Sequence, residues 1–210
     1  MSEDWAARWR EGRTGWHEQG GSALLRRYWP ALPSGSSVLV PLCGKSVDLL
    51  WLARQGYDVT GIELSEIAVQ ALFAENSLGF ETTIEGGLPC YRAGSLPLRV
   101  CCGDFFAWSS QRFDALYDRG ALVAVDPRDR ARYTDHVKSL LHPDAFRMII
   151  TLEYEQDKAP GPPWSVPADE LLAYWQDLQR AFAHDDLANC PPKFRAAGLT
   201  EMLEVVWLSR

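Results

Sequence analysis

The sequence has no run of apolar residues close to the roughly 18 that a membrane-spanning helix needs. It also has no basic stripe, because 21 Lys and Arg stand against 28 Asp and Glu among 210 residues, for a formal net charge of -7. This balance argues against nucleic acid and anionic membranes as partners. The N-terminal stretch MSEDWAARWREG is charged throughout and lacks the apolar core of a signal peptide. We therefore expect a cytoplasmic protein.

Cysteine and histidine are scarce. There are five cysteines, an odd number, and the neighbours Cys101 and Cys102 would point to opposite faces of a strand, so that they would rarely bridge each other. We expect reduced thiols, as in a cytosol. The histidines are scattered, and no C-x-x-C or H-x-x-x-H pair occurs, so we expect no bound metal.

A glycine-rich phosphate-binding turn is also lacking. Residues 36–66 predict a strand (Val38–Val40), a turn (Pro41–Lys45), a helix (Val47–Gln55) and a second strand (Asp58–Leu64). Glu63 follows Gly44 by nineteen positions, a spacing that suits a carboxylate accepting hydrogen bonds from the ribose of an adenosine cofactor. The turn reads P-L-C-G-K, and its single glycine does not suit a pyrophosphate. The pattern therefore favours S-adenosylmethionine (SAM).

Strand and helix signals alternate beyond this unit, which is typical of an α/β fold. We expect one domain over residues 1–210, with an N-terminal helical leader (1–35) that could act as a lid, and an α/β core (36–210). The core would be Rossmann-like, with a mostly parallel seven-stranded sheet and helices on both faces. Residues 76–95 look irregular, with a short extended pair around Tyr91. The remaining predicted strands are 98–102, 113–117, 146–154 and 199–208, and the remaining helices include 127–141 and 169–182.

Three further segments follow predicted strands. Gly103 and Asp104, in C-G-D-F-F, could meet the edge of an adenine ring, with a Phe on its face. Arg119, in Y-D-R-G-A, stays protonated and cannot act as a base. It could hold an anionic acceptor or the cofactor's carboxylate, or simply pair with Asp118 or Asp126. The proline-rich K-A-P-G-P-P-W-S-V-P segment (158–167) would form a stiff loop near the same edge of the sheet.

Taken together, these motifs resemble one family. They are W-x-x-x-W (Trp5, Trp9), G-W-H (15–17), V-L-V-P-L-C-G-K-S, G-I-E-L-S-E, C-G-D-F-F, Y-D-R-G-A-L-V-A, I-T-L-E-Y and P-G-P-P-W-S-V-P. They span nearly the whole chain in order. The chain resembles the bacterial type of thiopurine S-methyltransferase, in the class I SAM-dependent methyltransferase superfamily.

The resemblance implies an enzyme that methylates aromatic or heterocyclic thiols such as 6-mercaptopurine, and also selenium or tellurium species in metalloid detoxification. We expect a monomer with SAM as cofactor and no partner beyond a small-molecule acceptor. The implied cofactor-binding residues are Trp5, Trp9, Leu42, Glu63, Gly103, Asp104 and Arg119, to which the turn adds Gly44. The implied acceptor-binding residues are Trp16, where the family usually has Phe, Arg119, and either Lys193 or Arg195.

Charge suggests the mechanism. The sulfonium of SAM is positive and a thiolate is negative, so methyl transfer neutralises both, and a dry pocket favours the step. Acidic thiols then need no strong base, and alignment supplies most of the rate. Arg119 would stabilise the thiolate, with Asp118 as a less favoured proton acceptor. Three alternatives stay open: a halide or thiocyanate methyltransferase, an NAD-dependent oxidoreductase, and a non-catalytic SAM-binding regulator.

Overall fold

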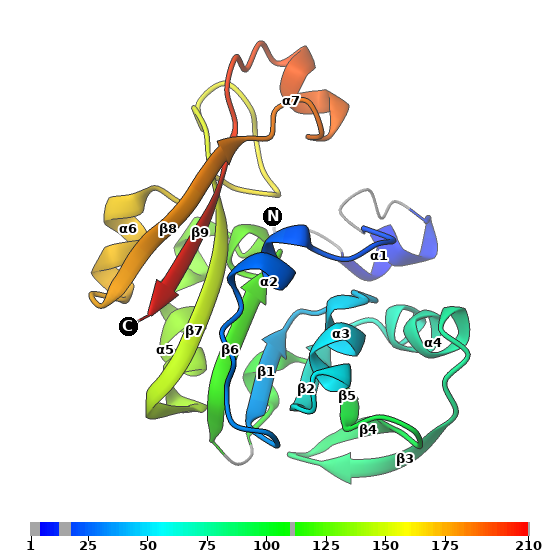
Figure 1. The fold of residues 1–210 in the computed structure, drawn as a ribbon. Coiled ribbons are helices and arrows are strands. Elements are labelled where there is room, and N and C mark those ends of the chain that lie inside the picture. Colours follow the sequence, from blue (N-terminus) through cyan, green and yellow to red (C-terminus); the bar gives the residue numbers. More distant parts are fainter. Residues whose placement is uncertain (1–4, 13–17, 110–111, 210) are drawn as a thin grey trace.

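A computed structural model describes residues 5–12, 18–109 and 112–209 of the chain. Within these ranges the strands form one sheet of nine, in the order β3-β4-β5-β2-β1-β6-β7-β9-β8 (Figure 1). The strands are β1 (Ser37–Pro41), β2 (Asp58–Glu63), β3 (Phe80–Glu85), β4 (Leu88–Ala93), β5 (Leu98–Cys102), β6 (Phe113–Arg119), β7 (Leu141–Glu153), β8 (Leu178–Asp185) and β9 (Leu203–Ser209).

The sheet corrects the prediction of seven mostly parallel strands. Its centre, β5-β2-β1-β6-β7, is parallel throughout. The four remaining pairings are antiparallel: β3 with β4, β4 with β5, β7 with β9, and β9 with β8. Hairpin β3–β4 is the extended pair expected around Tyr91, although it is longer than predicted, and with β8 it brings the sheet to nine strands. The α/β class and the parallel centre are as predicted.

Helices cover both faces of the sheet, as predicted. The helices are α1 (Trp5–Arg10), α2 (Ala23–Tyr28), α3 (Asp48–Arg54), α4 (Glu66–Glu75), α5 (Arg130–Ser139), α6 (Ala168–Tyr174) and α7 (Pro192–Ala196). Side chains alternate along β1, so that Val38 and Val40 pack with α2, α3 and α4, whereas Leu39 packs with α5 and α6. Each face thus buries its own apolar layer, and the sheet lies between them (Figure 1).

The helix predicted over residues 169–182 is wrong in its second half. Helix α6 ends at Tyr174, and β8 begins at Leu178 and pairs with β9 along its length. The sequence L-Q-R-A-F-A consists largely of residues that also suit a helix, so local propensity does not report this strand. Pairing with β9 decides it. The closing strand begins at Leu203 rather than at residue 199.

The expectation of reduced thiols is also wrong for one pair. Cys90 on β4 and Cys101 on β5 are direct cross-strand partners and form a disulfide. The other three cysteines, Cys43, Cys102 and Cys190, are free thiols. Hairpin β3–β4 is therefore linked covalently to the parallel centre of the sheet.

No helix within the described ranges combines the length and the apolar character that crossing a bilayer would require.

Candidate active site

A cavity of about 1170 Å³ opens at the carboxyl ends of the parallel strands. Its walls come from helix α1, the turns after β1, β2, β5 and β6, the proline-rich loop after β7, and the segments that flank α7. Figure 1 shows these parts of the chain converging above one edge of the sheet. Ligands of open α/β sheets bind at this edge.

The turn after β1 supports helix α1. Leu42 and Gly44 both have positive φ, at 47° and 56°. A Cβ atom built on Gly44 would lie 3.1 Å from Cζ2 of Trp9, so the indole packs directly on the bare backbone of the turn. Trp9 is buried, and it lines the cavity together with Trp5 and Leu42. These three residues, predicted to contact the cofactor, therefore lie around one end of the cavity.

Glu63 ends β2 and joins the two turns beside it. Its Oε2 accepts a hydrogen bond from the backbone N–H of Gly44 at 2.8 Å, and its Oε1 accepts one from Ser65 at 2.8 Å. The side chain is only 6% exposed, and burial raises the pKa of Glu63, although backbone hydrogen bonds oppose the shift. Because each carboxylate oxygen has two lone pairs, acceptor capacity remains for two hydroxyls in the cavity.

The turn after β5 lies beside this carboxylate. The backbone N–H of Gly103 donates to the carbonyl of Glu63 at 2.8 Å, which ties the ends of β5 and β2 together. Asp104 is exposed, and its Oδ1 caps the following 3-10 turn by accepting from Phe106 N at 3.0 Å. Gly103, Asp104 and the rings of Phe105 and Phe106 all line the cavity. These residues thus lie at the cavity, and their contact with an adenine ring stays a prediction.

Arg119 lies at the end of β6 and lines the cavity. Its guanidinium pairs with Glu18, and its Nε lies 4.0 Å from Oε1 of Glu204. The alternative reading, a surface pair with Asp118 or Asp126, is wrong: Asp126 instead pairs with Arg128. Arg119 thus connects the segment after α1 with strand β9 across the cavity.

Asp118 does not line the cavity. It is 1% exposed, its Oδ1 accepts from Leu122 N at 3.0 Å, and its Oδ2 accepts from the hydroxyl of Tyr133 at 2.7 Å. Burial raises the pKa of Asp118 to about 6. The predicted role as a proton acceptor for substrate does not agree with this position, because both oxygens face the protein interior. Asp118 instead holds the turn after β6 against α5.

The two C-terminal basic candidates have different surroundings. Lys193 lines the cavity, and its Nζ donates to the carbonyls of Pro160 and Pro162 at 2.9 and 2.8 Å. It thereby holds the proline-rich loop. Arg195 is not among the lining residues, and it donates to the carbonyls of Leu187 and Ala188. Of the two, Lys193 is therefore the one that lies at the cavity. Trp16, predicted to bind the acceptor, lies outside the described residues.

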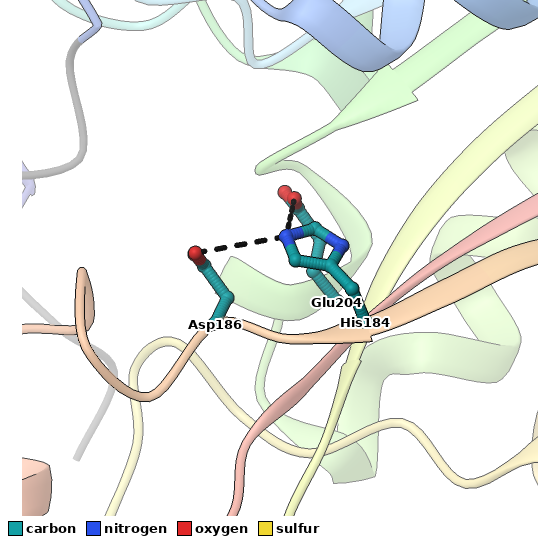
Figure 2. Close-up of side chains that lie close together, drawn as sticks. All are labelled: His184, Asp186 and Glu204. Carbon is teal, nitrogen blue, oxygen red and sulfur yellow. Dashed lines mark ion pairs between the residues drawn. The ribbon is translucent and has the colours of Figure 1, made fainter.

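The cavity also contains residues that the sequence reading missed. His184, Asp186, Glu204 and Glu18 line it, none of them within a recognised motif. The ligand atoms of His184, Asp186 and Glu204 lie within 4.8 Å of one another, a spacing that a metal ion could bridge (Figure 2). However, the guanidinium of Arg119 already lies 4.0 Å from Glu204 and would repel a cation. We therefore read the three residues as an ion-pair cluster. No local signal distinguished His184, because the predicted helix ended at residue 182 and no strand was predicted at His184 itself.

The residues at the β1–β2–β5 end fit an adenosine cofactor without phosphates. A buried carboxylate can accept from ribose hydroxyls, and Trp9, Phe105 and Phe106 add aromatic side chains to the same cavity wall. The turn after β1 has a single glycine and does not form a row of amides for a pyrophosphate. This donor set suits SAM.

Solved structures share the fold. The chain is similar to a TehB-like SAM-dependent methyltransferase from Corynebacterium glutamicum, with a TM-score of 0.55 and 19% identity over 100% of this chain and 98% of that one. It is also similar to 1,6-didemethyltoxoflavin-N1-methyltransferase from Burkholderia thailandensis, solved with S-adenosylhomocysteine, with a TM-score of 0.62 and 20% identity over 98% and 85% of the two chains. The fold is that of the SAM-dependent methyltransferases.

Sequence comparison narrows this class to a family. The model of the family described as thiopurine S-methyltransferase matches residues 1–210. Thiopurine S-methyltransferases from Bordetella petrii and Pseudomonas putida are each 41% identical to this chain, over 98% and 97% of it and 96% of each relative. The chain belongs to the thiopurine S-methyltransferase family.

Proposed function

We propose that this protein transfers a methyl group from SAM to the sulfur of aromatic and heterocyclic thiols, thiopurines among them. The observation that supports the proposal is a single cavity with two chemically different ends in a chain of this family. One end holds Glu63 between the β1 and β2 turns, and suits the adenosine. The other end lies towards the proline-rich loop and β9.

The second end suits a flat, apolar acceptor with one polar edge. Val123, Leu152, Pro162 and Met202 supply apolar lining, and Arg119 and Lys193 supply positive charge. An aromatic thiol could bury its ring against the first group and direct its anionic sulfur towards the second. This division favours thiols over halides, because a bare halide would leave the apolar wall without contacts.

Within this proposal, bound SAM supplies an activated methyl group on a positively charged sulfur. Glu63 holds the ribose by accepting from its hydroxyls. Trp5 and Trp9 cover the cofactor and exclude water, which strengthens electrostatic interactions in the cavity. Arg119 stabilises the anionic acceptor and Lys193 holds the loop that closes over it. The chain thus contributes mainly position and a dry environment, and effective molarities of roughly 10⁵ to 10⁸ M show how much rate alignment can supply.

A substrate panel tests the proposal. Purified protein with SAM is given 6-mercaptopurine, thiocyanate and iodide in parallel, and methylated products are measured by mass spectrometry. We expect S-methylated thiopurine as the main product. Dominant turnover of iodide or thiocyanate would reassign the protein to the halide methyltransferase alternative. Calorimetry with SAM and with NAD separates the two cofactors, and tight SAM binding without any product would indicate a regulator.

We extend the same proposal to selenium and tellurium nucleophiles, because methyl transfer from SAM is favoured by a soft, polarisable acceptor. Selenite and tellurite, each with a thiol reductant, form two additional arms of the panel. Volatile methylated products in the headspace would extend the acceptor class, and their absence would restrict it to sulfur.

A further inference from the structure

His184 lies at the acceptor end of the cavity. It is near the end of β8, directly opposite Glu204 on β9, and both residues line the cavity together with Asp186. Its Nε2 is 3.7 Å from Oδ1 of Asp186 and 3.8 Å from Oε2 of Glu204 (Figure 2). Strands β9 and β8 lie on the far side of β1 and β6 from β2, where Glu63 lies. The imidazole is therefore remote from the proposed ribose site and near the proposed acceptor.

The two ring nitrogens of His184 have different surroundings. Nδ1 is buried and has no hydrogen-bond partner among the described residues. The ring is also packed against Phe182, with centroids 5.4 Å apart, which limits its rotation. Nε2 points instead between the two carboxylates, as Figure 2 shows. A substrate in the cavity would therefore meet Nε2.

The charged groups that face Nε2 of His184 are mainly carboxylates, which favour a proton on that nitrogen. Asp186 and Glu204 face Nε2, and Asp185 is the next residue along the strand. A positive group, Arg119, also contacts Glu204, with its Nε 4.0 Å from Oε1. A proton on Nε2 would thus face two carboxylates at less than 4 Å, while Arg119 pairs with Glu18 and with the other oxygen of Glu204.

We propose that His184 accepts the proton of weakly acidic thiol acceptors and so extends the substrate range of the proposed S-methyltransferase. The thiol S–H bond breaks, its proton moves to Nε2, and its electron pair stays on sulfur as the thiolate. The thiolate then takes the methyl group as the S–CH₃ bond of SAM breaks, and the imidazolium returns its proton to water. The thiolate is the nucleophile, so this step matters for thiols that are neutral at the working pH, and not for those already ionised.

The test compares His184→Gln with the wild type on two aromatic thiols, one mostly ionised at pH 7 and one mostly neutral. We expect kcat/KM for the neutral thiol to fall by about 10²-fold, within the usual contribution of a positioned base, while the ionised thiol changes by less than about 3-fold. Raising the pH through the pKa of the neutral thiol should restore its rate in the variant. His142→Gln, an exposed histidine that is not part of the cavity wall, is the matched control.

A second variant covers the case in which His184→Gln fails to fold. Asp186→Asn keeps the imidazole and removes one carboxylate, and should reduce the rate with the neutral thiol selectively but by less. An equal loss on both thiols at every pH would show that His184 is structural and overturn the proposal. So would wild-type activity that disappears with a chelator and returns with a divalent cation, because the cluster would then be a metal site. The inference depends on the proposed function. If the wild type does not methylate the ionised thiol, both proposals are overturned. If the wild type is active but His184→Gln shows no selective loss of activity on the neutral thiol, only the role of His184 is overturned.

Discussion

Glu63 contacts the turn after β1 and the start of α4 at once, through hydrogen bonds of 2.8 Å to Gly44 and Ser65. A side chain in this position affects both cofactor affinity and the shape of the turn. The isosteric Glu63→Gln keeps one acceptor oxygen and replaces the other with a donor that faces a backbone N–H. The variant therefore separates charge from size.

We expect Glu63→Gln to weaken SAM binding by roughly 1 to 3 kcal/mol, the usual effect of losing a hydrogen bond to a charged group. Isothermal titration calorimetry measures the dissociation constant, and a thermal melt checks the fold. Glu81→Gln, an exposed carboxylate on β3, is the control and should bind SAM normally. An unchanged dissociation constant in Glu63→Gln would remove Glu63 from the ribose site.

Asp118 has a pH-dependent effect on stability. Burial raises the pKa of its carboxyl from 3.8 to about 6. Between these values the folded protein keeps a proton that the unfolded chain has lost, so the free energy of unfolding falls as pH rises through this window. A shift of this size corresponds to about 3 kcal/mol.

Asp118→Asn removes that titration. We expect its free energy of unfolding, relative to the wild type, to rise by about 3 kcal/mol between pH 4 and pH 6 and then to level off. Urea unfolding at intervals of half a pH unit measures the difference. Asp144→Asn controls for the loss of an exposed carboxylate as such. A difference that stays constant with pH would contradict the assigned titration.

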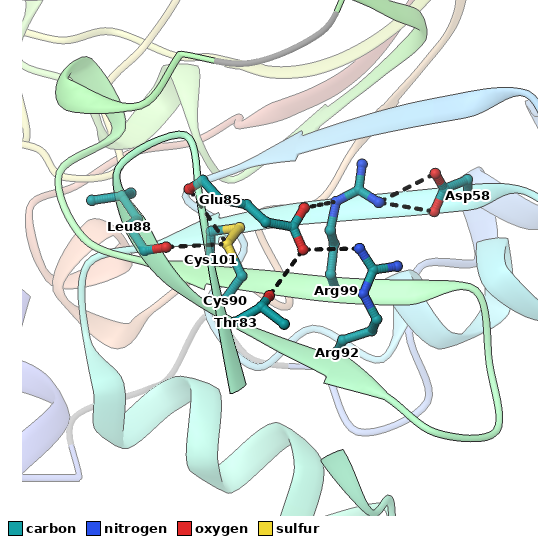
Figure 3. The surroundings of a disulfide bond; sticks show 8 residues. All are labelled: Asp58, Thr83, Glu85, Leu88, Cys90, Arg92, Arg99 and Cys101. Atoms are coloured by element: carbon teal, nitrogen blue, oxygen red, sulfur yellow. Dashed lines mark hydrogen bonds and ion pairs between the residues drawn. A yellow bond between two sulfur atoms is a disulfide. The ribbon is translucent and has the colours of Figure 1, made fainter. Parts of the chain in front are cut away.

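At the scale of elements, hairpin β3–β4 is held to the parallel centre of the sheet by a disulfide and by ion pairs. The Cys90–Cys101 disulfide joins β4 to β5, and Glu85 nearby bonds to Arg92 at 2.8 Å and pairs with Arg99 (Figure 3). Arg99 in turn reaches Asp58 on β2 at 3.3 Å. The disulfide closes a separation of 11 residues, for which chain entropy gives a stabilisation of about 3 kcal/mol.

Thiol counting tests this element. Unfolded but unreduced protein should react with three equivalents of an alkylating reagent, at Cys43, Cys102 and Cys190. After reduction all five cysteines should react. Mass spectrometry reads both counts, and Cys102→Ala should lower each by one. Five reactive thiols before reduction would contradict the disulfide and restore the original expectation.

Helix α6 and strand β8 show why some elements were predicted correctly from the sequence and others were not. The helix and strand of residues 48–63 were predicted to within about a residue, because their apolar pattern and Gly56 are local signals. For residues 178–182 the same kind of reading predicted a helix. There the pairing of Leu178, Gln179 and Arg180 with β9 outweighs intrinsic preference. Cross-strand pairing depends on two segments, so the sequence of one segment alone does not predict it.

At the scale of the whole molecule, the two ends of the chain meet at the cavity. Trp5, Trp9 and Glu18 line it from one side, and Lys193 and Glu204 from the other. Arg119 links Glu18 and Glu204 across the opening. A ligand that fills this space should therefore hold the N-terminal segment against the rest of the protein.

We expect S-adenosylhomocysteine at 100 times its dissociation constant to slow tryptic cleavage at Arg8 and Arg10 in helix α1 by up to about 100-fold, since it adds about 2.7 kcal/mol to the folded state. Timed digestion with N-terminal peptide mapping measures the rate. Trp9→Ala should reduce the protection, because the indole contacts the Gly44 turn. Equal cleavage with and without ligand would show that α1 does not respond to the cofactor.

The proposed cofactor end and the proposed acceptor end of the cavity differ in how far the sequence determined them. Gly44 and Glu63 belong to one strand–helix–strand unit, so their spacing alone predicted that both would lie beside one ligand, and the structure adds a direct hydrogen bond between them. The acceptor end brings together Glu18, Arg119, His184 and Glu204 from four separate segments. Their proximity depends on the order β6-β7-β9-β8, on antiparallel register, and on the packing of α1. The tertiary structure also decided that Lys193 lines the cavity and Arg195 does not, and that the carboxyl of Asp118 faces the protein interior. Local periodicity and turn chemistry operate over about twenty residues, whereas contacts across the sheet are decided only when the strands pair.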